Sequence, residues 1–268
     1  MSENSAVGQF KTQSDIMDPA RGAALLTVLG QDGNIRAGDA LPPFFHQAYF
    51  WDVQAQDDLG RDGHPGLGGF IPNLDLPRRM WAGGRIEFKR PLIAGMPAEK
   101  RVTIENITRK TGRSGPLGFV TLRHEIWQGE ALCVTERQDL VYRNDPTERD
   151  AQIDPPPAPD GHIVDRVNFG PTQLFRYSAL TFNGHRIHYD LDYCRKVEGY
   201  AGLVVHGPLL AQHLILMCQA KLGALSSFDF RATAPLLDFE TAQMGWKDGK
   251  AWIKGPDERL CMTARATS

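Results

Sequence analysis

The sequence predicts an α+β fold built from two similar units, each with a helix followed by antiparallel strands. Both halves of the chain begin with a helical pattern and end in segments whose apolar residues alternate. Both contain an acidic-Phe-basic step before a Pro-Leu pair, "EFKRPL" at 87–92 and "DFRATAPL" at 229–236. Between them lies the proline-rich "PPPAP", which cannot continue a helix or a central strand. A duplicated unit explains this pattern, although chance similarity would give the same outline.

The proline-rich stretch also sets the expected domain boundaries. Residues 1–144 are expected to form the first unit, 145–161 a semi-rigid linker over the surface, and 162–268 the second unit. Each part has the size of a small domain.

The first unit should open with the helix "DPARGAALLTVLG". Asp18 is expected to cap it, Pro19 suits its first position, and Leu25, Val28 and Leu29 share one face. The alternation in "FVTLRHEIW" predicts a strand, which a turn at "GE" joins to a second strand, "ALCVTERQDLVYR".

The second unit repeats this order. In "PTQLFRYSALTF", Thr172 is the expected helix cap. The long apolar pattern "GPLLAQHLILMCQAKLG" predicts a buried helix with Pro208 in its first turn and Gly223 at its end. Asp248-Gly249 then predicts a two-residue hairpin turn.

Composition excludes several classes of function. The 268 residues are 41% hydrophobic and 23% charged, with a formal charge of −2, which gives no electrostatic basis for binding nucleic acid or an anionic membrane. No apolar run reaches the length of a bilayer span, and the first residues lack a secretory or transit pattern. The four scattered cysteines are expected to be reduced thiols. These features predict a cytoplasmic protein of enzyme size.

The stretch "TFNGHRIHYD" at 181–190 places Asn183, His185 and His188 close together. They could be hydrogen-bonded core residues. They could also bind a metal with downstream histidines and a cysteine, but neither a paired-cysteine nor an H-E-x-x-H signature is present, so we expect no metal site. The third possibility is acid–base chemistry, because His188 can exchange a proton near neutral pH and Asn183 can hold a water molecule.

The surrounding sequence, "FRYSALTFNGHRIHYDLDYCRKVEGYAGLVVHGPL", resembles the MaoC-like enoyl-thioester hydratases and dehydratases. It is most similar to their double-hotdog branch, which includes mesaconyl-C4-CoA hydratase, itaconyl-CoA hydratase and type 2 hydroxyacyl-thioester dehydratases. "DLGRDGHPGLGGFIPNLDLPRRMWAGGRIEF" resembles the matching first-half stretch of that branch. The resemblance implies a double hotdog, two units each with a central helix wrapped by an antiparallel sheet.

The resemblance also implies roles for five residues. The catalytic histidine of the family falls on His188, and its catalytic aspartate falls on Asn183, which departs from the broad MaoC pattern. His185 and Arg186 fall on the Asn and Pro of the family signature and are candidates for substrate binding. Gly207, at the start of the central helix, corresponds to the glycine whose N–H binds the thioester carbonyl.

A basic stretch, "LPRRMWAGGRIEFKR", is the candidate site for substrate anions. Arg78, Arg79 and Arg85 could contact the phosphates of CoA, and Trp81 could line the acyl pocket. A solvated basic face is the alternative. The nearby "GRDGHPGLGG" at 60–69 lacks the spacing of a phosphate-binding loop and is expected to be a lid.

The expected activity is that of a hydro-lyase on an acyl-CoA or acyl-carrier-protein thioester. A branched C4–C5 dicarboxylyl-CoA of the mesaconyl-C4 or itaconyl type is the favoured substrate, and dehydration of a 3-hydroxyacyl thioester is the alternative. A thioesterase is a second class and a non-catalytic acyl-binding protein a third. The reaction is expected to need no cofactor, the catalytic site to lie in the second unit, and the chain to form a homodimer.

Overall fold

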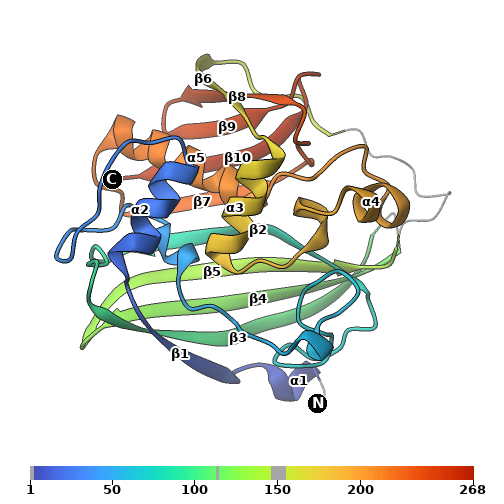
Figure 1. The fold of residues 1–268 in the computed structure, drawn as a ribbon. Helices are drawn as coiled ribbons and strands as arrows, with labels where there is room; N and C mark the ends of the chain where they lie inside the picture. The colour runs from blue at the N-terminus through green and yellow to red at the C-terminus, as the bar shows by residue number, and fades with distance from the viewer. Residues whose placement is uncertain (1–2, 113–114, 146–154) are drawn as a thin grey trace.

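A single ten-stranded antiparallel sheet runs through the computed structural model of the chain, which describes residues 3–112, 115–145 and 155–268 (Figure 1). Its strand order is β1-β3-β4-β5-β2-β7-β10-β9-β8-β6. The strands are β1 (Phe10–Ile16), β2 (Arg78–Phe88), β3 (Pro97–Gly112), β4 (Gly115–Gln128), β5 (Ala131–Arg143), β6 (His162–Asn168), β7 (Ser227–Ala232), β8 (Thr241–Lys247), β9 (Lys250–Lys254) and β10 (Leu260–Thr267).

Three helices, α2, α3 and α5, lie on the same face of this sheet (Figure 1). Short helical turns connect the remaining elements. The helices and turns are α1 (Glu3–Ala6), α2 (Pro19–Val28), η1 (Phe45–Ala48), η2 (Gln56–Asp58), α3 (Pro171–Thr181), η3 (Arg186–His188), α4 (Leu191–Tyr193), η4 (Cys194–Glu198) and α5 (Gly207–Leu222).

The second half of the chain repeats the strand order of the first. Strands β1 to β5 lie in the order 1-3-4-5-2, and β6 to β10 lie in the mirrored order 7-10-9-8-6. The halves join where β2 pairs with β7, with Gly83 opposite Arg231 and Gly84 opposite Phe230. The predicted helix-first order was incomplete, because an edge strand precedes the predicted helix of each half, β1 before α2 and β6 before α3. These strands were missed because their exposed faces weaken the apolar alternation.

Most of the local signals in the sequence are confirmed. Asp18 caps α2 by accepting the Ala20 N–H at 2.9 Å, and Gly223 ends α5 at φ 82°. Asp248 and Gly249 form the turn between β8 and β9, both with positive φ. The Thr172 cap is wrong: α3 begins at Pro171 with Gly170 as its N-cap, because the proline already fixes the first helical position.

The two units differ in how a helix fills them. In the second unit, α5 is sixteen residues long and buries a row of apolar side chains among β7, β9 and β10: Leu209, Leu210, Leu214, Ile215 and Met217. In the first unit α2 has ten residues. Part of the inner face of β3, β4 and β5 there lines a cavity.

The predicted linker lies mainly at 146–154, outside the described residues. Its described end runs beside the start of β10, where the Leu260 N–H donates to the Pro156 carbonyl and the Ala158 N–H to the Glu258 carbonyl, each at 2.9 Å. All four cysteines are free and buried. Among the described residues, no helix has the length and apolar character that crossing a bilayer requires.

Candidate active site

Helix α5 begins at Gly207 on the wall of a large cavity. His206 precedes it as the N-cap (φ −59°, ψ 130°), and Pro208 occupies the next position. The first N–H groups of a helix have no partner inside the helix and carry the positive end of its dipole. A Cβ added at Gly207 would meet only the Trp81 carbonyl oxygen, 3.9 Å away. Gly207 therefore offers a backbone donor beside an open volume.

The segment after α3 brings three polar side chains to the same cavity. The Asn183 side-chain oxygen accepts the backbone N–H of His185 at 3.0 Å, which closes a tight turn. The turn leads into η3, whose last residue is His188. Asn183, His185 and His188 all line the cavity together with Gly207. The residues that the sequence motif brought together thus share one wall.

One hydrogen bond fixes the proton on the His188 ring. Its Nδ1 lies 2.7 Å from the carbonyl oxygen of Val204. A carbonyl can only accept, so Nδ1 carries the hydrogen of the neutral ring and Nε2 keeps a free lone pair. The side chain is only 6% exposed and lines the cavity. This tautomer is the one that a general base needs.

The surroundings of His188 keep the ring neutral. Its ring stacks on His206 with centroids 3.6 Å apart, and His185 approaches it edge-on at 5.4 Å. The pKa of His188 is lowered to about 3, chiefly by burial and also by the charge of His185, against the opposing effect of the hydrogen bond to Val204. Burial likewise lowers the pKa of His185 to about 4, helped by the charges of Arg79 and Arg78. At neutral pH the His188 ring is therefore neutral, with Nε2 unprotonated.

The cavity has a volume of about 950 Å³ and is built by both halves of the chain. The second half supplies the histidine segment and the start of α5. The first half supplies a loop, part of β2 and the inner face of β3 to β5. Its wall includes Gln47, His64, Arg79, Trp81, Lys100, His124, Gln138, Asn183, His185, His188 and Gly207.

The loop at 60–69 packs directly on the histidine segment. Gly63 has φ 82°, and a Cβ there would lie 2.1 Å from the Gly184 carbonyl oxygen, so only glycine fits. The Arg186 N–H donates to the Asp62 carbonyl at 2.9 Å, which ties the two segments together. His64 and the residues that follow it line the cavity. The loop thus covers this wall of the cavity.

The predicted basic stretch separates into two groups. Arg79 and Trp81 line the cavity. Arg78 instead forms a buried ion pair with Glu198. Arg85 is 54% exposed and faces Glu87 and Asp229, away from the cavity wall.

Arg186 also lies outside the cavity wall. Its guanidinium pairs with Asp190 at 2.7 Å and lies 4.4 Å from the centre of the Tyr193 ring. Asp190 in turn accepts the Tyr193 N–H and caps α4. Arg186 therefore contributes to the local fold of the segment.

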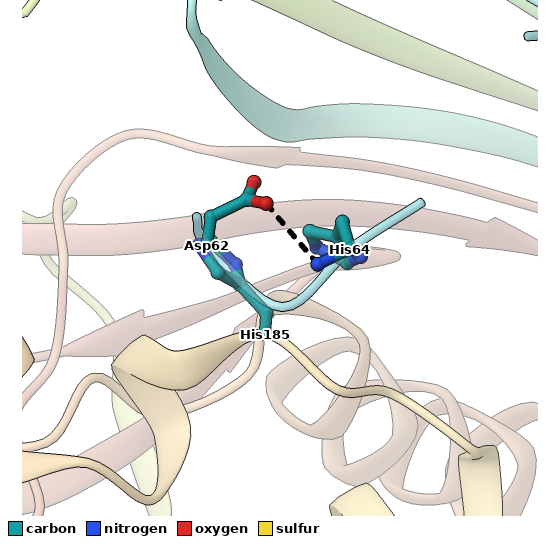
Figure 2. Close-up of side chains that lie close together, drawn as sticks. All are labelled: Asp62, His64 and His185. Carbon is teal, nitrogen blue, oxygen red and sulfur yellow. Dashed lines mark hydrogen bonds between the residues drawn. The ribbon is translucent and has the colours of Figure 1, made fainter. Parts of the chain in front are cut away.

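Asp62, His64 and His185 form a cluster whose potential ligand atoms lie within 4.8 Å of one another (Figure 2). In Figure 2 the Asp62 carboxylate accepts the backbone N–H of His64, at 3.1 Å. The positive charge of Arg79 acts on both histidines and opposes the binding of a cation. The sequence did not predict this cluster, because His64 lies 121 positions before His185 in the chain. Our expectation of no metal site stays a prediction.

A second polar set on the cavity wall was also missed: Gln47, Lys100, His124 and Gln138. A signal for two of them was present in the alternation of the strands. Lys100 lies two positions from the buried Val102 on β3, so the two side chains lie on the same face of the sheet. His124 likewise lies two positions from the inward-facing Leu122 and Ile126 on β4.

Because the protein buries several histidines, we expect its free energy of unfolding to fall steeply in acid. The pKa of each is lowered mainly by burial: His124 and His188 to about 3, His213 to about 4, and His206 well below its usual value. The unfolded chain binds these protons near pH 6.5, so their contribution is complete above that pH and is lost as the pH falls toward the folded values. Each histidine should lower the free energy of unfolding by up to about 1.4 kcal/mol per pH unit in this window.

Urea unfolding between pH 7.5 and pH 5 measures this slope. His213→Gln is the matched variant, because His213 lies on α5 outside the cavity wall, and it should make the slope shallower. A free energy of unfolding that stays constant from pH 7.5 to pH 5 would contradict the prediction.

Comparisons with known proteins agree with this architecture. The family model described as hydroxyacyl-thioester dehydratase type 2 matches residues 44–238. A mesaconyl-C(4)-CoA hydratase from Chloroflexus aurantiacus is 48% identical over 81% of this chain and 78% of its own length.

The crystal structure of HtdX from Mycobacterium tuberculosis has a TM-score of 0.69 at 19% identity, covering 96% of this chain and 99% of its own. A conserved hypothetical protein of the same organism with a double hotdog fold has a TM-score of 0.63 at 13% identity, covering 97% and 95%. The predicted double hotdog is confirmed.

Proposed function

Because the chain belongs to the hydroxyacyl-thioester dehydratase type 2 family, we propose that it reversibly adds water across the double bond of an enoyl-CoA thioester. One observation carries the proposal: the free Nε2 of His188 and the first-turn N–H of Gly207 line the same cavity. These are the two groups that this reaction requires, a proton acceptor and a donor for the developing charge.

Gly207 would bind the thioester carbonyl oxygen. As water adds to the β-carbon, negative charge builds on that oxygen, and a fixed backbone donor stabilises the charge without reorganising. Such a donor typically contributes about 10²–10³-fold to the rate.

His188 would move the proton. Its Nε2 takes a proton from the attacking water, and the resulting imidazolium returns a proton to the α-carbon of the enolate, so the ring ends neutral. General-base assistance of this kind contributes typically about 10²–10⁴-fold. The side-chain oxygen of Asn183 already accepts the His185 N–H, so its amide nitrogen is the group that would orient the water.

The proposed acyl group is a branched C4–C5 dicarboxylyl group of the mesaconyl-C4 or itaconyl type. Its support is the name of the Chloroflexus relative and two of the three cations on the cavity wall, Arg79 and Lys100; the third, Lys11, is paired with Asp52. Among the described residues, neither cation has a carboxylate within 4 Å. We propose that Arg79, near the histidine segment, attracts the anionic part of the CoA.

Dehydration of a 3-hydroxyacyl thioester, on CoA or a carrier protein, is the second candidate. The family description favours it, and the same residues would catalyse it as the reverse reaction. A thioesterase is less well supported. Asp190, which could have supplied its carboxylate, is engaged by Arg186 and lies outside the cavity wall.

Changing Asn183 to aspartate is expected to leave kcat within about tenfold of the wild-type value. A carboxylate can accept the His185 N–H in the same turn, and it can still hold the water. Asn183→Ala loses both interactions and should lose more activity. Steady-state hydration rates measure the difference, and an Asn183→Asp protein less active than Asn183→Ala would contradict the assignment.

We also propose that the protein acts in the cytoplasm as a homodimer without a metal or organic cofactor. The chemistry above uses only an imidazole, an amide and water. Light scattering of the purified protein would test the assembly, and a mass equal to that of one chain would rule out the dimer.

A panel of thioesters tests the proposed function. Mesaconyl-C4-CoA, itaconyl-CoA, crotonyl-CoA and 3-hydroxybutyryl-CoA would be followed by the enoyl-thioester absorbance and by product mass. We expect hydration of at least one enoyl thioester. Release of free thiol without a change in the double bond would support a thioesterase instead.

A further inference from the structure

The part of the cavity that lies in the first unit has a polar wall. Lys100 on β3, His124 on β4 and Gln138 on β5 line it, and Gln47 joins them from η1. The strand register brings these side chains together, since Val102 pairs with His124 and Leu122 with Gln138. A cavity wall built only to receive an alkyl chain would be apolar here.

Two lysines, Lys11 and Lys100, line this part of the cavity, and Lys100 lacks a carboxylate partner within the described part of the chain. Its ammonium donates to the Phe50 carbonyl at 3.4 Å and lies 5.1 Å from the centre of the Phe50 ring. Within the described part of the chain, no carboxylate lies within 4 Å of it. The nearby Lys11 already pairs with Asp52 at 2.8 Å.

The buried carboxylate behind this wall has its own partners. Glu136 is 1% exposed and is held by His46 at 2.8 Å, Gln47 at 3.1 Å and Gln138 at 3.2 Å. Burial would raise its pKa, but the His46 hydrogen bond and charge outweigh burial and lower it. Glu136 is therefore charged and fully hydrogen-bonded without direct contact from a lysine.

The surroundings of Lys100 favour an added anion. The pKa of Lys100 is lowered to about 8, chiefly by burial and also by the charge of Lys11, against the opposing charges of Glu136, Asp52 and Asp15. A desolvated ammonium without a contacting carboxylate gains much from one. His124 lines the same part of the cavity, and its buried Nε2 has no hydrogen-bond partner in the described structure.

We propose that Lys100, with His124, Gln47 and Gln138 beside it, forms a subsite that binds a carboxylate on the acyl group of the substrate. This inference rests on the proposed function and assigns the residues that would bind the free carboxylate of the proposed dicarboxylyl substrate. The same subsite selects against long alkyl chains, because an alkyl end placed there would bury the Lys100 ammonium without giving it an ion-pair partner. Lys100 is thus a specificity-determining residue in the non-catalytic half of the chain.

Replacing Lys100 with methionine tests the subsite, because methionine has similar length and no charge. We compare kcat/KM for mesaconyl-C4-CoA, crotonyl-CoA and trans-2-octenoyl-CoA, which carry a carboxylate, a short neutral chain and a longer alkyl chain. The variant should lose roughly 30-fold or more on the first substrate. It should change little on the second and gain on the third.

Two further variants complete the experiment. Lys110→Met is the control, an exposed lysine on the same strand, and it should leave all three values unchanged. Lys100→Gln removes the charge but keeps a hydrogen-bond donor for the Phe50 carbonyl. It replaces the methionine variant in the same comparison if that variant does not fold.

The outcomes separate the two proposals. A Lys100 variant that shifts all three substrates by the same factor, or shifts none, would overturn the subsite while leaving the hydro-lyase function intact. A wild-type protein that hydrates none of these three and not itaconyl-CoA either would overturn the proposed function itself.

Discussion

Replacing His188 with alanine is expected to lower kcat for hydration by about 10²–10⁴-fold. The imidazole is held by its Nδ1 bond to Val204, so Nε2 is the free basic nitrogen on the cavity wall. Burial keeps the ring neutral at neutral pH, so the wild-type enzyme always presents the form that accepts a proton. Alanine removes that acceptor and leaves the cavity open.

The measurement is the initial rate of loss of the enoyl-thioester absorbance, with far-UV circular dichroism and thermal unfolding to verify the fold. His213→Gln is the matched control, because it removes a histidine from α5 that does not line the cavity. It should keep its activity. If the His188→Ala protein turned over at the wild-type rate while remaining folded, the acid–base assignment would be wrong.

Changing Gly207 to proline is expected to lower kcat by about 10²–10³-fold, because proline removes the N–H that would bind the thioester oxygen. The fold should tolerate the change. Proline suits the first position of a helix, and the backbone of His206, with ψ 130°, already has the conformation preferred before a proline.

Gly207→Ala is the control for this variant. It keeps the N–H, and its Cβ would meet only the Trp81 carbonyl oxygen at 3.9 Å. The alanine protein should therefore retain most of its activity. If the proline and alanine proteins were both as active as the wild type, the amide would have no role in catalysis. If both were inactive, the loss would point to a steric effect of the side chain.

The sequence predicted the features that depend on neighbouring residues. The Asp18 cap, the end of α5 at Gly223 and the hairpin at 248–249 each follow from the chemistry of one to three residues. The edge strands β1 and β6 were missed because they are short and polar on their exposed faces. The pairing of β2 with β7 joins residues nearly 150 positions apart, and no local pattern encodes it.

The candidate site shows the same division. The motif around His188 was found because its residues are close in sequence, and its resemblance to a known family supplied the partner Gly207. The fate of Arg78 was not predictable, because its partner Glu198 lies 120 positions away in the chain. The partner of Arg186 is Asp190, four positions along the same motif, so a local signal for this ion pair was present and was missed. Lys100 was missed because a charged residue in an alternating strand is ordinarily assigned to the solvent side.

Mass spectrometry of the product formed in ¹⁸O-labelled water distinguishes addition of water to the double bond from hydrolysis of the thioester. Purified protein would be incubated with mesaconyl-C4-CoA in the labelled solvent. We expect an intact thioester that has gained one labelled water, with loss of the enoyl absorbance and no free CoA. Free CoA together with an acid labelled at its carboxyl group, and an undiminished double bond, would contradict this expectation.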